Sequence, residues 1–545
     1  MIDRFQIREL QELVGNDLLA RLKIILPYVP NSGLDHPNDI YEREYLVKIF
    51  LSFSGQDILS KREFREQILC HISEKEIKYL ADTLGINSKL DFKNLISKIS
   101  GMEWGNNENS KKFLQFFKLP IDFLPSPKKE LSNIESLNKP YVPFKILKDF
   151  QIRIFEKSMK KIENPVQRFI IQMPTGSGKT RTAMEIIAFQ LNMNPGKSIM
   201  WIANSEELCE QAVECFKDVW SHIGNFDVDV IRAWGSNDLV IPTRSSFIVG
   251  GFSKLNSTFK KKRELAEKIR DDLVIVVIDE AHQVIAPTYK RVVETILESN
   301  YKSHLIGLTA TPGRSDILCS ETKDLTDFFS GEKIEIDSGE KTVFEYLRDK
   351  KVLSNIEKDP LITDIYYKLS EEDKKYIENY FDYPPGLLKK ISQDDARNLE
   401  IIKKLKYECE LNKKVIFFAG SIDQSKFICA LLNFMEFGAE HVDGSTGKDR
   451  RRYIIEKFKQ GQLNVICNFG VLTTGFDAPK TDVVFIARPT MSIVLYSQMV
   501  GRGLRGSAIG GTNTCKLIDV IDNIEKYGSP DRVYDYFEQY WGTNE

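Results

Sequence analysis

The chain has 545 residues, enough for three or four domains of the usual size of about 100 to 200 residues. With 42% hydrophobic and 28% charged residues it resembles a soluble globular protein, and no apolar run approaches the roughly 18 residues of a membrane helix. The net charge of -2 gives no general attraction to nucleic acid, so any such binding would need a local basic groove.

The N-terminal residues and the cysteines indicate where the protein is located and whether it holds a zinc site. The first twenty residues mix charged side chains with short apolar stretches and do not resemble a secretory signal, so we expect a cytoplasmic protein. The eight cysteines form no Cys-x-x-Cys pair and have no histidine pair at zinc spacing nearby. We therefore expect reduced thiols and no zinc site.

Residues 1–130 are predicted to form a helical accessory domain. The segments 17–26 and 75–84 place apolar residues at intervals of three and four, which is the helical period. Prolines among serines, asparagines and lysines then predict a linker, which we place at 131–144.

Two series of apolar, strand-like runs alternate with helical patterns in the rest of the chain. The first occupies residues 145–313 and the second residues 412–545, which should also end in a helix. Because such alternation is typical of parallel sheets covered on both faces, we expect an α/β fold with two of these domains in tandem. The charged segment 314–411 between them is predicted to be a helical connector or insertion.

The segment 173–180, Met-Pro-Thr-Gly-Ser-Gly-Lys-Thr, carries the most specific chemistry. Its small residues let backbone N–H groups turn inward to hold phosphate, and the segment lies between a predicted strand and a predicted helix, as such loops do. We expect Lys179 to reach the β- and γ-phosphates of a nucleotide and Thr180 to bind Mg²⁺. Met173 replaces the glycine of the strict Walker A motif. The predicted nucleotide-binding residues here are Pro174, Thr175, Gly176, Ser177, Gly178, Lys179 and Thr180.

A second chemical signal follows about one hundred residues later, where the apolar run 274–278 ends in Asp279, Glu280, Ala281 and His282. Adjacent carboxylates at a strand end repel each other unless a cation is near, which indicates a metal. We expect Asp279 to hold Mg²⁺ and Glu280 to activate the water that attacks the γ-phosphate.

Together, residues 174–180 and 279–282 resemble the motifs of superfamily 2 helicases with the DEAH signature. The resemblance covers about residues 147 to 525. It implies two RecA-like domains, ATP and Mg²⁺ bound in the cleft between them, and a nucleic-acid groove across both.

Further segments resemble the other motifs of this family in the family's order. Gln151 would read the adenine base, although Lys148 and Asp149 depart from the usual arginine and proline beside it. Gly475 and Asp477 would also bind the nucleotide. Thr309 and Thr311 would couple the ATP site to the groove. The residues that the resemblance places on the nucleic acid are Asn204, Ser205, Gly251, Phe252, Thr309, Thr311, Gly420, Ser421 and Thr473.

The segment 498–505 should supply the positive charge that a phosphoryl-transfer site needs. Guanidinium groups suit phosphate oxygens, and the three-residue interval would place Arg502 and Arg505 on one side of a helix. By resemblance, Arg505 is the arginine finger, Arg502 contacts the γ-phosphate and Gln498 lies near the water. ATP would then draw the two domains together, and hydrolysis would let them part.

The residues 503–505 and 308–312 resemble the branch that holds DNA repair helicases and restriction-enzyme translocases, as does the stretch 516–523. We therefore expect a DNA motor, with RNA as the less favoured substrate, in repair, restriction or phage (antiviral) defence. The basic runs 260–263 and 448–452 could meet phosphates, but such runs are more often solvated helix faces.

Two alternatives remain open at this stage. The chain could use ATP as a switch that clamps nucleic acid or a partner without translocation. It could also be the motor subunit of a nuclease encoded on another chain, since residues 1–130 show no convincing nuclease constellation. Those residues could load DNA, recruit a partner or restrain the motor.

Overall fold

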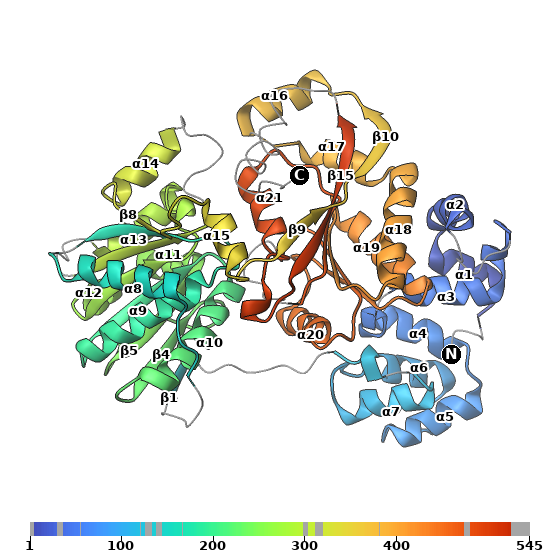
Figure 1. The fold of residues 1–545 in the computed structure, drawn as a ribbon. Coiled ribbons are helices and arrows are strands. Elements are labelled where there is room, and N and C mark those ends of the chain that lie inside the picture. The colour runs from blue at the N-terminus through green and yellow to red at the C-terminus, as the bar shows by residue number, and fades with distance from the viewer. Residues whose placement is uncertain are drawn as a thin grey trace.

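The computed structural model describes residues 5–29, 36–54, 56–119, 121–125, 133–137, 144–165, 167–297, 303–310, 320–380, 382–472 and 480–524. Two sheets with helices on their faces lie side by side, and a helical bundle packs beside the second (Figure 1). This confirms the predicted α/β fold, with two RecA-like parallel-sheet domains in tandem and a helical N-terminal domain.

The first sheet has the strand order β1-β4-β5-β3-β6-β7-β2-β8, and all neighbouring strands are parallel except β1 and β4. Its inner strands are apolar because helices cover both faces; all six residues of β3 are buried. The strands are β1 (Ile134–Leu137), β2 (Arg168–Gln172), β3 (Ser198–Ala203), β4 (Val228–Ala233), β5 (Ser246–Gly251), β6 (Leu273–Ile278), β7 (His304–Thr309) and β8 (Lys333–Glu335).

Two hydrophobic cores hold the helices against this sheet. Helices α8, α9 and α10 share one core, and α11, α12, α13 and α14 share the core on the opposite face. Their bounds are α8 (Asp149–Ile162), α9 (Lys179–Met193), α10 (Glu206–Ile223), α11 (Phe252–Lys261), α12 (Arg263–Arg270), α13 (Pro287–Leu297) and α14 (Ser320–Phe328), with a 3-10 turn η6 (Ala281–Gln283).

The second sheet has the order β10-β15-β14-β11-β13-β12, with β9 also paired to β15, and all its pairs are parallel. Helices α18 and α19 cover one face, and α20 and α21 lie on the face toward the first domain. The strands are β9 (Asn355–Lys358), β10 (Leu361–Tyr367), β11 (Val415–Phe418), β12 (Ala439–Val442), β13 (Val465–Asn468), β14 (Val483–Ile486) and β15 (Thr514–Ile524). The helices are α15 (Val343–Asp349), α16 (Glu371–Tyr380), α17 (Pro385–Ser392), α18 (Asp395–Glu410), α19 (Ile422–Phe434), α20 (Lys448–Lys459), α21 (Ile493–Val500) and η7 (Ser507–Ile509).

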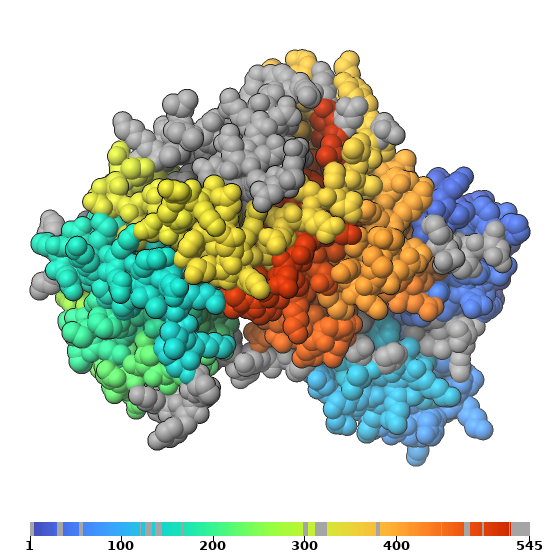
Figure 2. Space-filling model, viewed as in Figure 1, coloured from blue at the N-terminus to red at the C-terminus, as the bar shows by residue number. Residues whose placement is uncertain are grey.

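The segment 314–411, expected to be a helical connector or insertion, contributes strands to both sheets. Strand β8 pairs with β2 in the first domain, and β9 and β10 pair with β15 in the second. Strands β8 and β9 are short and charged, so they lack the apolar run that marks an inner strand. In Figure 2 this part of the chain, in yellow, runs across the surface of both domains.

The N-terminal helices pack on the second domain and share its core. Helix α3 lies along α19, and α2 lies against α18. Arg21 donates hydrogen bonds of 2.6 and 2.8 Å to Asp395 and lies 4.3 Å from the ring centre of Phe427. The bundle comprises α1 (Ile7–Val14), α2 (Asn16–Ile25), α3 (Arg43–Ser54), α4 (Arg62–Cys70), α5 (Glu74–Thr83), α6 (Phe92–Ser100) and α7 (Glu108–Phe116), with short turns η2 (Leu26–Tyr28), η3 (Asp39–Tyr41), η4 (Gln56–Ser60) and η5 (Ile121–Phe123).

The predicted linker at 131–144 contains β1, which extends the far edge of the first sheet. Glu135 on β1 bonds Lys217 at 2.9 Å and Arg232 at 3.1 Å, so ion pairs anchor this strand. The expected C-terminal helix falls in 525–545, outside the described residues. Within the described ranges, no helix is long and apolar enough to cross a membrane.

Candidate nucleotide site between the two domains

The phosphate-binding loop connects β2 to α9, as the sequence predicts. Gly176 and Gly178 have φ of 84° and 87°, a left-handed region that side chains rarely adopt. A Cβ at Gly178 would lie 2.4 Å from Gln151 Nε2, so only glycine fits there. Ser177 Oγ donates a 2.7 Å hydrogen bond to the carbonyl of Pro174, which closes the turn.

Gln151, predicted to read adenine, holds this loop from behind. Its side chain is buried, its Nε2 donates to the carbonyl of Ser177 at 3.1 Å, and its Oε1 accepts from the amide of Lys148 at 2.9 Å. The loop shape thus depends on Gln151, while its contact with adenine stays a prediction.

Two carboxylates lie beside the loop at the end of β6. Lys179 Nζ is 3.7 Å from Glu280 Oε1, and His282 Nδ1 is 3.5 Å from Glu280 Oε2. Glu280 has φ of 48°, a strained left-handed conformation that turns the chain directly after the strand. Asp279 Oδ1 accepts the Glu280 amide at 3.0 Å, which fixes the two carboxylates relative to each other.

The electrostatics of the two carboxylates differ. Burial raises the pKa of Asp279 to about 6, with Lys179 acting against this and Glu280 adding to it. Burial alone would also raise the pKa of Glu280, but the charges of Lys179, His282 and Arg502 lower it. Glu280 is therefore held ionised, as a residue that accepts a proton from water must be.

The donor set fits a divalent cation held by Asp279 and Thr180. A cation beside the buried Asp279 would favour its ionised form, and Mg²⁺ prefers carboxylate and hydroxyl oxygens. Among the described residues, no group of three or more His, Cys, Asp and Glu side chains could hold a metal alone. Phosphate oxygens and water would have to complete the coordination, which is the usual arrangement for Mg²⁺ at nucleotides.

Thr309 joins the two halves of this site within the first domain. Its carbonyl accepts the amide of Met173 at 3.0 Å, and its Oγ1 lies 3.3 Å from His282 Nδ1. Thr309 is fully buried, and its direct contact with nucleic acid stays a prediction. Its position still suits the predicted coupling between the nucleotide loop and the end of β6.

The second domain packs directly on the phosphate loop. A Cβ at Gly501 would lie 2.7 Å from Thr175 Cγ2, and one at Gly176 would lie 3.8 Å from Arg505 Cγ. Arg502 is close enough to Glu280 for its charge to lower the pKa of that carboxylate. The segment after α21 therefore brings Arg502 and Arg505 to the nucleotide site, and Gln498 lies one turn earlier on α21.

The predicted placement of both arginines on one helix is wrong, because α21 ends at Val500. A Cβ at Gly503 would lie 2.2 Å from Cys515 Sγ, so the chain approaches β15 too closely for a side chain. Arg505 instead forms an antiparallel bridge with Leu353. The two arginines thus come from a tight turn and from a short extended segment.

The other predicted nucleic-acid residues lie where parallel strands end. Asn204 and Ser205 follow β3, Gly251 ends β5, and Gly420 and Ser421 follow β11. The carboxyl ends of parallel strands are where open α/β sheets bind ligands. Asn204 Nδ2 donates to Gln283 at 2.8 Å, whereas Ser205 and Ser421 cap α10 and α19.

Phe252 is an exception among these residues. Its side chain is 3% exposed and packs edge-on against Tyr289 with ring centres 4.2 Å apart. The side chain thus belongs to the core, as an apolar residue after a buried strand usually does, and contact of this segment with nucleic acid stays a prediction. Thr311, Thr473, Gly475 and Asp477 lie outside the described residues.

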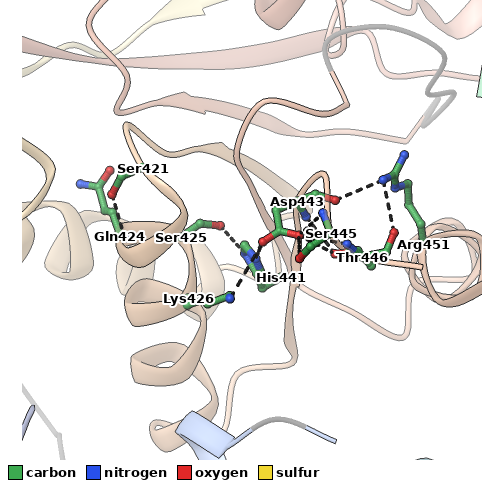
Figure 3. A network of polar contacts seen from close by, with 9 residues as sticks. All are labelled: Ser421, Gln424, Ser425, Lys426, His441, Asp443, Ser445, Thr446 and Arg451. Atoms are coloured by element: carbon green, nitrogen blue, oxygen red, sulfur yellow. Dashed lines mark hydrogen bonds and ion pairs between the residues drawn. The ribbon is translucent and has the colours of Figure 1, made fainter. Parts of the chain in front are cut away.

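Figure 3 shows a polar network in the second domain that includes Arg451, and this side chain also contacts the first domain. The buried Asp443 accepts the amides of Ser445 and Thr446 at 2.8 and 3.0 Å, which shapes a turn after β12. Arg451 donates to the carbonyl of Asp443 at 3.1 Å and forms an ion pair with Glu207 at the start of α10. This ion pair spans the two domains.

The same network contains a Ser-His-Asp chain, the residue types of a hydrolase triad, with the two ring nitrogens exchanged relative to that triad. Ser425 Oγ lies 2.7 Å from His441 Nδ1, and His441 Nε2 lies 3.1 Å from Asp443 Oδ2. Burial lowers the pKa of His441, so the neutral ring donates from Nε2 to the carboxylate and accepts from the serine. Because Ser425 is fully buried, it cannot attack a substrate, and the chain is structural.

Sequence reasoning missed the segment 351–355, which lies between the phosphate loop and Arg505. Leu353 Cδ2 would lie 3.5 Å from a Cβ at Gly176, and Ser354 Oγ donates to the carbonyl of Arg505 at 2.6 Å. The only sequence signal was the short apolar pair at 352–353 after a charged stretch.

Comparison with known proteins matches two family models to the two domains. Residues 144–314 match the model "Type III restriction enzyme, res subunit", and residues 397–507 match "Helicase conserved C-terminal domain". Both matched ranges contain residues of the candidate nucleotide site: Lys179 and Glu280 in the first, and Arg502 and Arg505 in the second.

Individual relatives match over most of both domains. A 51.5 kDa protein of a Lactococcus phage is 28% identical over 68% of this chain and 70% of its own length. The helicase-named protein IRC3 of Saccharomyces cerevisiae is 25% identical over 69% of this chain, and the match spans about half of that protein, 51%. The DNA 3'-5' translocase XPB2 of Sulfurisphaera tokodaii is 24% identical over 67% of this chain and 81% of its own.

Proposed function

Because the chain belongs to the superfamily 2 helicases, in the branch related to restriction and repair enzymes, we propose that this ATP-dependent nucleic-acid motor moves along DNA. The observation that supports a motor best is the contact between the phosphate loop and the second domain. Thr175 meets Gly501, and Gly176 lies beside Arg505. A nucleotide at the loop must therefore touch both domains, so binding and hydrolysis change how the domains meet.

The proposed role of each residue follows from its position in the nucleotide site. The loop 174–180 holds the phosphates, and Lys179 stabilises the charge that develops on them. Glu280 takes a proton from the attacking water, with Gln498 as a second group near that water. Arg502 and Arg505 stabilise charge on the γ-phosphate from the second domain. Thr180 and Asp279 would hold Mg²⁺, which would neutralise charge on the phosphate oxygens.

DNA is the proposed track, with RNA as the less favoured one. The first domain matches a restriction-enzyme model, and one relative is named as a DNA translocase. We propose that a strand lies across the strand ends that carry Asn204, Ser205, Gly251, Gly420 and Ser421. The Glu207–Arg451 ion pair lies near this line, because Glu207 follows Ser205 by two residues.

Two measurements test this proposal. The first is the rate of ATP hydrolysis with single-stranded, duplex and forked DNA and with RNA. The second is ATP-driven displacement of a third strand from a triplex. Stimulation by DNA and ATP-driven displacement are expected. Hydrolysis without displacement would favour an ATP-switched clamp. Stimulation by RNA alone would overturn the choice of DNA, and copurification of a nuclease would indicate the motor subunit of a larger enzyme.

A further inference from the structure

We propose that Ser354 is a positioning residue for the arginine finger, so that the segment between the two domains sets the reach of Arg505 into the nucleotide site. This inference rests on the proposed role of Arg505 in ATP hydrolysis. Ser354 lies in the segment 351–355, outside every motif that the sequence indicates.

Ser354 holds the backbone on both sides of Arg505. Its Oγ donates to the carbonyl of Arg505 at 2.6 Å and lies 2.7 Å from the carbonyl of Thr512. Its amide donates to the carbonyl of Leu504 at 2.9 Å. Ser354 is fully buried, so water cannot replace these bonds if the hydroxyl is lost.

The chain around Arg505 needs such support because glycines flank it at positions 503 and 506. Glycine leaves a backbone free to adopt many conformations. Gly506 donates to the carbonyl of Val352 at 2.9 Å, and a Cβ on Gly506 would lie 2.2 Å from the carbonyl of Lys351. The segment 351–355 therefore confines this loop, and the Arg505 side chain starts from a fixed Cα.

The same segment touches the phosphate loop through its neighbouring residue. Leu353 is 2% exposed, forms the backbone bridge to Arg505, and places Cδ2 3.5 Å from where a Cβ of Gly176 would lie. A shift of the phosphate loop would thus press on Leu353, whose backbone is joined to Arg505. Leu353 and Ser354 are adjacent in the chain, and both are bonded to the backbone of Arg505.

The segment 351–355 is also the end of the connection from the first domain. Tyr346 on α15 accepts a 2.8 Å hydrogen bond from Arg153 on α8, which belongs to the first domain. The amides of Val352 and Leu353 then bond the carbonyl of Leu347 at 2.9 and 3.2 Å. A rotation between the domains must therefore act on the chain between Tyr346 and Ser354, and so on Arg505.

The decisive experiment is a double-mutant cycle on ATP turnover at saturating DNA, with ATP affinity measured separately. Ser354→Ala should lower kcat about 10- to 100-fold, the effect of a misplaced catalytic group, while ATP affinity stays unchanged. Ser354→Thr keeps the hydroxyl and should recover most of the turnover. In the Arg505→Ala background, Ser354→Ala should cause no further loss, because the group that it positions is gone.

Ser158→Ala is the matched control, since Ser158 is a fully buried serine on α8 whose Oγ donates to the carbonyl of Ile154 in the same helix. It should keep wild-type turnover. Additive losses from Ser354→Ala and Arg505→Ala, or no recovery with Ser354→Thr at unchanged melting temperature, would overturn the positioning role alone. A wild type without nucleic-acid-stimulated ATPase would overturn the proposed function and this inference with it.

Discussion

Lys179 Nζ and Glu280 Oε1 lie 3.7 Å apart, with only 11% and 14% of their side chains exposed. One residue begins α9 and the other follows β6, so the sheet brings together groups one hundred residues apart. This pair allows the proposed roles of Lys179 in phosphate binding and Glu280 in water activation to be separated by substitution.

Glu280→Gln should abolish most ATP hydrolysis while ATP binding persists. The amide keeps the shape of the side chain but cannot take a proton, and loss of such a base costs about 10²- to 10⁴-fold in rate. Lys179→Ala should weaken both binding and turnover. Turnover assays and a fluorescent ATP analogue measure the two effects.

The exposed Glu294 on α13 offers the control for this pair, and Glu294→Gln should behave as wild type. Full turnover in a folded Glu280→Gln variant would show that the water is activated elsewhere.

Glu207→Arg should reduce closure of the two domains, because it places two positive charges where the structure has an ion pair with Arg451. Partly buried charged hydrogen bonds are worth about 1.5–3 kcal/mol. The reversed pair, Glu207→Arg with Arg451→Glu, should restore closure. Energy transfer between dyes on the two domains, with a nucleotide analogue bound, measures the closed fraction.

Glu214→Arg on the same helix is the control, since Glu214 is exposed and contacts only Lys217 among the described residues. If the double reversal behaved no better than the single changes, the ion pair would have no role in closure.

Asp443→Asn should destabilise the second domain at neutral pH and lose this effect in acid. Burial alone would raise the pKa of Asp443, but hydrogen bonds from Ser445 and His441 hold it well below its usual range. A carboxylate with a lowered folded-state pKa stabilises the fold above its unfolded pKa of about 3.9, and this contribution is lost as pH falls further.

Thermal unfolding of the wild type and Asp443→Asn between pH 3 and 7 tests this difference. The gap in melting temperature should be constant above about pH 5 and shrink below about pH 4. Asp423→Asn, an exposed carboxylate on α19, should give no such pattern. A gap that persists unchanged to pH 3 would contradict the assignment.

Removal of residues 1–130 should destabilise the second domain and promote aggregation. The deletion uncovers apolar side chains of α19 that α3 now covers, including Phe427 and Phe434, which are 4% and 1% exposed. Each uncovered large side chain costs about 1.5–3 kcal/mol. Size-exclusion chromatography and dye binding to exposed apolar surface report the effect.

Arg21→Ala provides a milder test of the same interface. It removes the ion pair with Asp395 and the contact with Phe427 but leaves the bundle in place, so a small loss of melting temperature without aggregation is expected. If the truncated chain were monomeric and as stable as the full chain, the bundle would be an independent unit.

The nucleotide loop and the inner strands could be predicted because their signals are local. Residues 168–172 form an apolar run before a glycine-rich loop, and the structure places β2 and α9 around that loop. Strands covered on both faces are apolar throughout, so β2, β3, β5, β6 and β7 of the first sheet coincide with apolar runs of the sequence.

The remaining features depend on contacts between distant segments. Strand β9 has the sequence Asn-Ile-Glu-Lys, which carries no strand pattern of its own. It is a strand in the structure because it pairs with the edge of β15. The glycine at position 503 is needed because Cys515, from the distant strand β15, leaves no room for a side chain there. Phe252 could have been predicted as core from its apolar character, but its place in a motif suggested a surface role.

The N-terminal bundle is anchored on the second domain, and β1, which follows it in the chain, is anchored on the first. The chain therefore crosses between the two domains at a second place, before the phosphate loop. Leu124 is packed in the core shared with the second domain, while Asn133 accepts a 2.7 Å hydrogen bond from Arg232 in the first. The chain between Pro125 and Asn133 spans at most about 30 Å when fully extended. The two domains are therefore joined by two covalent ties, and the chain between Pro125 and Asn133 limits how far they can separate while both of its anchors hold.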